Sequence, residues 1–235
     1  EWLSVVETKA AKTDTITFAY TENEFSIRRA DVLFIDEVDN TITKISFIQQ
    51  GAATEVTLTK AGTLLETIGE ELCQNIKSLI INGPINGTDV IWLKRMNNLS
   101  HLDLSNASIV EGGNSYSDGD YTKNNIITHL MFHGMWNLTS ILLPDTISSI
   151  ESFAFYGSQI SKIDLPDNIT TIGSNAFSGC TKLESVKLPE NLEEIGESAF
   201  ARCGLLKSIT IPQNVKKIAS YSFTVCYKIE EIHIK

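Results

Sequence analysis

The stretch IGSNAFSGCTKLESVKLPENLEE, from Ile172 to Glu194, is followed directly by a second version of itself, IGESAFARCGLLKSITIPQNVKK, from Ile195 to Lys217. Three further rows with the same order of residue types begin at Ile127, Ile150 and Ile218. One phenylalanine recurs every 22 or 23 residues, at Phe132, Phe155, Phe177, Phe200 and Phe223. A fixed period in the low twenties predicts a solenoid of small stacked units.

The rows also share a proline, at Pro144, Pro166, Pro189 and Pro212. Before it runs a short segment of alternating apolar and polar residues, such as Leu183–Leu188, which is typical of a strand. Proline has no N–H group, so it ends the strand and begins a turn. The row from Ile150 is one residue short after Phe155, where YGSQI replaces the longer SGCTKL. We expect parallel strands about 4.8 Å apart and a buried column of phenylalanines.

The repeated words I-G-x-x-A-F, a following Cys, and L-x-x-[IV]-x-[LI]-P resemble the leucine-rich repeats of the BspA-like type, found on surface proteins of Bacteroides and related bacteria. The resemblance covers residues 127–235. It implies an α/β leucine-rich repeat solenoid, rich in β structure, and an adhesin-like role. The end rows depart from the pattern at Met131, Met135, Ala219 and Ser222.

Length and charge limit the function classes. The chain has 235 residues and a net charge of −10, with a pI near 4.9. An acidic chain is a poor partner for nucleic acid or for anionic membrane surfaces, which favour basic patches. We find no stretch of about 20 apolar residues that would span a membrane. The chain opens at Glu1-Trp2 without a methionine or a signal region, so we expect a fragment or a mature form of a longer protein.

The four cysteines do not have metal-site spacing such as C-x-x-C. Cys180, Cys203 and Cys226 lie 23 residues apart and are expected to stack as one buried, reduced column. A disulfide between rungs is the alternative, and it would leave one thiol of the column without a partner. Cys73 lies elsewhere, in a helical pattern.

The sequence of residues 1–52 predicts β structure. Ile16, Phe18 and Tyr20 alternate with polar residues, as do Ile45 and Phe47, and a strand-like run covers Ala30–Ile35. The phrases WLSV, RRADV and ISFIQQGA resemble the later half of a BACON domain, an immunoglobulin-like module of the same bacteria. The resemblance implies a small partial β-sandwich that serves either as a carbohydrate-binding module or as a spacer. We prefer the spacer.

Residues 53–126 are expected to form an N-terminal cap and the first repeats. Thr63 to Glu66 has the form of a capping box, and Leu64, Leu65, Ile68, Leu72 and Ile76 share one helical face. A strand at Leu79–Ile81 and a second helix at Asp89–Met96 follow, then LSHLDLSNASI at Leu99–Ile109, a leucine-rich repeat motif. The polar stretch from Glu111 to Asn125 is predicted to be a long surface loop.

Two patterns have the residue types of a metal site. Asp118, Asp120 and Asn124 lack the complete spacing and the closing glutamate of a calcium loop, so we favour a solvated loop. His129 and His133 stand four apart, like a zinc pair on a helix, but the repeat register places them in a turn. We find no nucleophile elbow and no phosphate loop. We therefore predict that the protein is no enzyme and has no catalytic residues, no cofactor and no metal site.

The exposed faces of the strands are more informative. One ladder runs through Leu142, Asp164, Lys187, Thr210 and His233, and the other through Thr139, Ser161, Glu184, Lys207 and Glu230. Ion pairs between rungs are expected along Glu184, Lys207 and Glu230. Neither ladder is aromatic, unlike the usual sugar-binding face. The candidate ligand-contacting residues are Lys162, Asp164, Glu184, Lys187, Lys207, Thr210 and His233.

We therefore expect a secreted or outer-surface interaction protein that binds an extracellular protein partner, host proteins included. The alternatives are a carbohydrate-binding module for glycan or mucin, acting through residues 1–52, and a structural spacer. The last strand, Ile229–Ile234, has no following turn to cover it. An open strand edge predicts weak end-to-end self-association, unless the chain is a piece of a longer protein.

Overall fold

The computed structural model describes residues 3–7, 17–20, 28–35, 42–49 and 53–235. The chain divides into two compact units, Glu1–Thr54 and Glu55–Lys235.

The described residues of the first unit form two antiparallel strand pairs. Strand β1 (Leu3–Glu7) pairs with β2 (Thr17–Tyr20), and β3 (Arg28–Ile35) pairs with β4 (Ile42–Gln49). The strands predicted around Phe18, at Ala30–Ile35 and at Ile45–Phe47 are confirmed. Part of the BACON-like resemblance, Trp2 and Gln50–Ala52, lies outside the described residues, as does Ile16.

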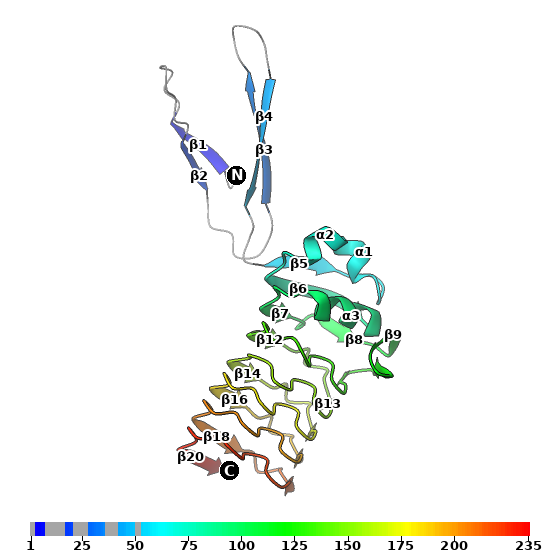
Figure 1. The fold of residues 1–235 in the computed structure, drawn as a ribbon, viewed down its shortest axis with the longest axis vertical. Helices are drawn as coiled ribbons and strands as arrows, with labels where there is room; N and C mark the ends of the chain where they lie inside the picture. The colour runs from blue at the N-terminus through cyan, green and yellow to red at the C-terminus, as the bar shows by residue number, and fades with distance from the viewer. Residues whose placement is uncertain (1–2, 8–16, 21–27, 36–41, 50–52) are drawn as a thin grey trace. The chain divides into compact units, whose positions relative to one another are not determined.

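The second unit is the solenoid expected from the repeat (Figure 1). One ladder of parallel strands joins the row starts, in the order β11 (Ile126–Ile127), β13 (Ser149–Ile150), β15 (Thr171–Ile172), β17 (Glu194–Ile195) and β19 (Lys217–Ile218). The strands before the prolines are β12 (Ser140–Leu142), β14 (Lys162–Asp164), β16 (Ser185–Lys187) and β18 (Ser208–Ile211), and β20 (Glu231–Ile234) is their counterpart in the row of Ile218. Equivalent residues pair one rung apart, as Ile163 does with Val186.

Asparagines fasten the turns that follow the prolines. The side-chain amide of Asn191 donates to the carbonyl of Asp167 at 2.9 Å, and that of Asn214 donates to the carbonyl of Glu190 at 2.8 Å. Asn168 makes the same bond to Asp145 at 2.7 Å. Each of these turns thus donates a directional hydrogen bond to the preceding rung, which holds the rungs in register.

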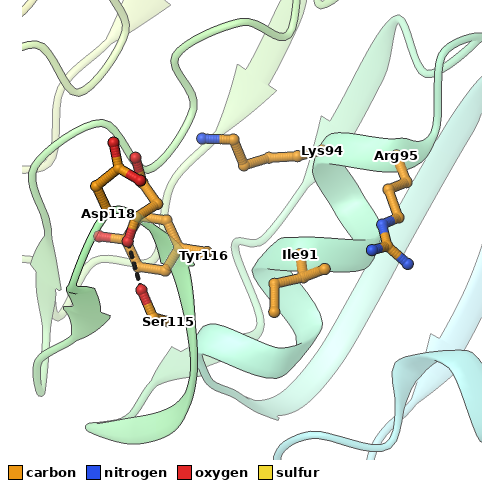
Figure 2. Close-up of a pocket in the computed structure, with 7 residues that line it drawn as sticks. Ile91, Lys94, Arg95, Ser115, Tyr116 and Asp118 are labelled. Carbon is orange, nitrogen blue, oxygen red and sulfur yellow. Dashed lines mark hydrogen bonds between the residues drawn. The ribbon is translucent and has the colours of Figure 1, made fainter.

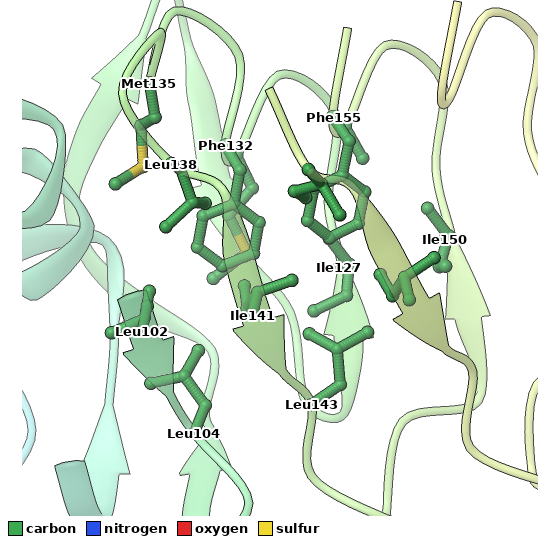
Figure 3. Close-up of a cluster of buried hydrophobic side chains, with 14 of the residues drawn as sticks. Leu102, Leu104, Ile127, Phe132, Met135, Leu138, Ile141, Leu143, Ile150 and Phe155 are labelled. Atoms are coloured by element: carbon green, nitrogen blue, oxygen red, sulfur yellow. The ribbon is translucent and has the colours of Figure 1, made fainter. Parts of the chain in front are cut away.

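The phenylalanine column lies in the core as predicted. Phe132, Phe155, Phe177 and Phe200 are fully buried, and Phe223 is partly buried. Neighbouring rings stack with centroids 5.0–5.6 Å apart and planes within 17° of parallel. Figure 3 shows Phe132 and Phe155 packed above the apolar side chains of the strands, including Ile127, Ile141 and Ile150. The core therefore runs through the rungs without a break.

The cysteine column is confirmed for two of its three members. Cys180 and Cys203 are buried, and each thiol donates to the carbonyl of a phenylalanine in an earlier rung, at 3.2 Å. Cys226 is only half-buried, contrary to the prediction, because its rung has no further rung over it among the described residues. All four cysteines are free thiols, so the column carries no disulfide.

This difference predicts unequal thiol reactivity. Burial raises the pKa of Cys180 to about 11, and the hydrogen bond to Cys226 together with burial raises the pKa of Cys203. A raised pKa leaves less thiolate, the reactive form, so both thiols are expected to resist alkylation at pH 8. Mass spectrometry of the native protein treated with iodoacetamide should show Cys226 labelled at least about tenfold faster than Cys203. Equal labelling rates would place Cys203 outside the core.

The cap that precedes the solenoid is less regular than its sequence pattern suggested. It contains α1 (Leu64–Ile68), α2 (Glu70–Cys73), α3 (Gly87–Arg95) and the strands β5 (Thr54–Thr57), β6 (Ser78–Ile85), β7 (His101–Asp103) and β8 (Ala107–Ile109). The sheet order β5-β6-β7-β12 joins the cap to the repeats. The predicted single helix is broken at Gly69, whose φ of 83° lies in the left-handed region. Leu72, predicted to face the core, is 49% exposed for that reason.

The cap depends on a carboxylate that the sequence pattern did not single out. Thr63 makes no side-chain capping bond, contrary to the predicted capping box. Instead the fully buried Asp89 accepts from the backbone N–H groups of Gly62, Leu64 and Asn86, at 2.6, 2.9 and 2.9 Å. With the Asn86 side chain, Asp89 also forms the capping box of α3. One side chain therefore ties the start of α1 to the start of α3.

The polar stretch after the cap is a β-hairpin, not the predicted loop. Strand β9 (Gly112–Ser117) pairs with β10 (Asp120–Thr122), and the hairpin lies against α3. Tyr116 is buried there, and its hydroxyl bonds to the Thr128 hydroxyl at 2.5 Å and to the carbonyl of His129 at 2.9 Å. This single buried aromatic gives the polar segment an ordered structure.

The last rung exposes apolar side chains as expected. Ile232 and Ile234 are 52% and 80% exposed, and Tyr221, Val225 and Tyr227 are exposed in the same rung. Ile229 keeps part of its contact with the core.

Candidate functional site

The exposed strand face is the first candidate surface. All seven predicted ligand-contacting residues are exposed on it, namely Lys162, Asp164, Glu184, Lys187, Lys207, Thr210 and His233. Asp164 is in register with Lys187, and Thr210 with His233. We call these seven residues the strand face.

Charges on the strand face largely neutralise one another. Lys207 pairs with Glu184 of the rung before it at 3.0 Å, as predicted, and Lys162 pairs with Asp164 at 3.4 Å. The expected continuation from Lys207 to Glu230 is not among the ion pairs of the described chain. Exposed pairs of this kind contribute about 0–1 kcal/mol each, so they fix side-chain positions more than stability. The result is a surface of alternating sign on a rigid backbone.

A second candidate is the cleft between α3 and β9, with a volume of about 500 Å³. It is lined by Ile91, Lys94 and Arg95 from the helix and by Ser115–Asp118 from the hairpin. Figure 2 shows Lys94 extending toward Tyr116 while Arg95 points to another side. The two cations therefore do not converge on one anion.

Both cations of this cleft already have partners. The Lys94 ammonium donates to the carbonyl of Leu130 at 2.9 Å and lies 5.6 Å from the centre of the Tyr116 ring. Arg95 stacks on Trp92 at 4.7 Å. Burial lowers the pKa of Lys94, and burial raises that of Tyr116 to about 12, so the Tyr116 hydroxyl keeps its proton at neutral pH. The Lys94 contacts fasten the hairpin and the row of Ile127 to α3, whereas the Arg95–Trp92 contact lies within α3, and we assign the cleft no ligand.

The residues considered for metal binding have other contacts. His129 lies 2.9 Å from a carboxylate oxygen of Asp120, and the Asn124 side chain accepts from the backbone N–H of Glu111. His133 packs against Trp136 instead of turning toward His129. Among the residues that the structure describes, no three His, Cys, Asp or Glu side chains gather in a way that would hold a metal ion.

One group of aromatic side chains escaped the sequence analysis. His133, Trp136, Phe153 and Tyr156 meet at the corner of the first two rows, with ring centres 5.6–5.8 Å apart. Burial, with the nearby Lys94 and His129, lowers the pKa of His133, so its ring is neutral at neutral pH. The sequence is irregular beside this corner, with one residue missing after Phe155, but this does not by itself indicate that the rings meet.

Comparison with known proteins agrees with the repeat register. Residues 120–230 match the family described as BspA type leucine rich repeat region, in six copies. A search of the curated proteins finds no match. Within the described parts of the chain, no helix is long and apolar enough to cross a membrane.

Three solved structures illustrate the likeness. A leucine-rich repeat protein from Bacteroides ovatus is 24% identical over 86% of this chain and 51% of its own, with a TM-score of 0.55. One from Bacteroides capillosus is 35% identical over 40% of this chain and 65% of its own, with a TM-score of 0.36. One from T. pallidum is 30% identical over 38% of this chain and 52% of its own, with a TM-score of 0.32.

The Bacteroides ovatus structure shows the fold, a leucine-rich repeat solenoid. This chain spans about half to two thirds of the length of the three proteins.

Proposed function

We propose that this chain is an adhesin-like interaction protein, secreted or held on a bacterial outer surface, that binds an extracellular protein through its strand face. The observation that carries the proposal is the register of that face. Six of its seven polar or charged residues stand exposed on adjacent parallel strands over buried side chains, and the seventh, His233, continues the face on the last rung. Host proteins are included among the partners.

Rigidity favours binding by such a face. The strand residues are held by backbone ladders and by side chains such as Ile163, Val186 and Ile209, which alternate with the exposed ones and are buried. Binding therefore requires little ordering of the backbone, which lowers its entropic cost. A surface of alternating sign favours a partner of complementary alternating charge over a strongly basic or acidic one.

The proposed surface location of the protein rests on its likeness to BspA type repeats. The match of residues 120–230 to BspA type repeats supports a surface-associated setting. We expect no catalytic activity and no cofactor, because leucine-rich repeats serve mainly as extended binding surfaces. End-to-end association through Ile232 and Ile234 of the last rung remains part of the proposal.

The N-terminal unit is proposed to have a role of its own. We regard residues 1–52 as a partial BACON-like domain that serves as a spacer before the solenoid. A carbohydrate-binding role for this unit is the alternative. If the chain binds glycans selectively and loses this binding when residues 1–52 are removed, the carbohydrate-binding role is favoured over the spacer role.

Charge reversal tests the strand face. A partner is first captured from extracellular matrix or mucus with the whole chain, and its affinity is measured. Lys162→Glu combined with Lys187→Glu should weaken its binding by about tenfold or more, because two attractive contacts become repulsive. The same charge change in Lys216→Glu combined with Lys217→Glu, on the ladder of β17 and β19, should leave affinity within about twofold, since these residues are not on the strand face.

Both double variants lower the net charge equally, so a general electrostatic effect would weaken them alike. Circular dichroism and thermal unfolding check that each variant is folded. Equal losses in the two variants, or unchanged binding of the Lys162 and Lys187 variant, would contradict the strand-face proposal.

A further inference from the structure

A groove of about 400 Å³ crosses three rungs beside the strand face. Its lining includes Trp136, Asn137, Gln159, Ser161, Lys182 and Glu184. The first two belong to the row of Ile127, the next two to the row of Ile150, and the last two to the row of Ile172. The groove therefore follows the stack of rungs.

The missing residue of the middle row explains the groove. Four residues separate Phe155 from Ile160, whereas five separate Phe177 from Leu183 in the next row. All four of these apolar side chains are fully buried, so the rows are anchored alike in the core. The shorter connection cannot reach out as far as its neighbours. The two flanking rungs, roughly 10 Å apart at two strand spacings, form walls on either side of it.

Trp136 is a fixed aromatic wall of this groove. Its side chain is 56% exposed, yet its ring rests on Gly157, where an added Cβ would lie only 2.5 Å from a ring carbon. His133 contacts it edge-on, with ring centres 5.8 Å apart at an angle of 74°. The indole thus has a set orientation and an open surface, which is the arrangement that favours stacking against a flat ligand.

The polar walls supply hydrogen bonds and one uncompensated charge. Gln159 and Asn137 bring amide groups and Ser161 brings a hydroxyl, which both donate and accept. Glu184 is neutralised by Lys207 at 3.0 Å. Lys182 has no ion-pair partner within 4.0 Å in the described part of the chain. The groove therefore combines an aromatic surface, neutral polar groups and one available cation.

We propose that this groove binds an acidic sugar residue of a glycan, with the sugar ring stacked on Trp136 and its carboxylate paired with Lys182. A pyranose presents C–H groups on one face and hydroxyls around its rim, which match the indole and the amides. The site is distinct from the N-terminal unit and does not depend on protein binding by the strand face.

Titration with sialyllactose tests the proposal on the full chain, with lactose as the neutral sugar. Sialyllactose should change the fluorescence of Trp136 and bind at least about tenfold more tightly than lactose. Trp136→Ala should weaken sialyllactose binding by roughly tenfold and remove the fluorescence change. Lys182→Gln should reduce the preference for sialyllactose over lactose to about twofold or less while Trp136 still responds.

Two further variants separate binding from folding. Tyr227→Ala removes an aromatic side chain that is 82% exposed at the matching corner of the last row, and it should leave binding unchanged. Insertion of one glycine after Gln159 restores the length of the short row and should abolish binding while Trp136 remains and the thermal transition is retained. Binding that survives this insertion, or equal binding of both sugars by the unaltered chain, would overturn the proposal. So would binding of acidic peptides with no response to either sugar.

Discussion

Replacement of Phe177 by alanine is expected to lower the free energy of unfolding by about 3–5 kcal/mol. The ring is fully buried between Phe155 and Phe200, with centroids 5.0 and 5.2 Å away. The rungs are held apart by their backbone ladders, so they cannot close fully around the missing ring, and a cavity remains. Urea unfolding followed by circular dichroism measures the loss.

Phe223→Ala is the matched control for this substitution. Phe223 belongs to the same column, but it has a ring neighbour on one side and is only partly buried. Its removal should cost about half as much or less, because water can fill the space beside the last rung. If Phe177→Ala cost under about 1 kcal/mol, the column would carry little of the stability of the solenoid.

Asp89→Ala is expected to have an effect of similar size, about 3 kcal/mol or more. The substitution leaves the N–H groups of Gly62, Leu64 and Asn86 without their acceptor, and Asp89 itself has no exposed surface. Buried donors without a partner cost about 1–3 kcal/mol each, and water entering the gap recovers part of this. Thermal unfolding and hydrogen exchange of α1 and α3 would show the loss.

Asp103→Ala serves as the control for a removed carboxylate. Asp103 accepts one backbone bond, from Ser105 at 2.8 Å, in an exposed setting. Its replacement should cost about 1 kcal/mol or less, since water replaces the lost acceptor. Equal effects of the two substitutions would mean that Asp89 does not join α1 to α3.

The structure of the repeat region was predictable because each residue lies beside the equivalent residue of the adjacent row. Stacking at a fixed period places Phe155 beside Phe177 and Cys180 beside Cys203 whatever the path of the chain between them. Alternation in the strands then decides which side chains are exposed, so the strand face also followed from spacing. Cys226 differs only because its rung is the last, where the neighbour that defines burial is missing from the described structure.

The cap lacks this periodicity, and local sequence patterns gave wrong predictions there. Thr63 has the sequence of a capping residue, but the acceptor for Leu64 is Asp89, 25 residues away. The polar hairpin is ordered by one buried ring, Tyr116, whose partners lie beyond the hairpin itself. Such contacts depend on where the chain returns in space, which a window of neighbouring residues does not contain.

The sequence by itself therefore determined the solenoid, its register, the buried column and the exposed strand face. In a stacked repeat, the spatial neighbours of each residue are the equivalent residues of the adjacent rows. Tertiary structure decided the cap and the groove at Trp136. A single missing residue in the row of Ile150 is a small irregularity in the sequence. It becomes a groove only when the longer rungs stack on both sides of it and their side chains extend past the shorter one.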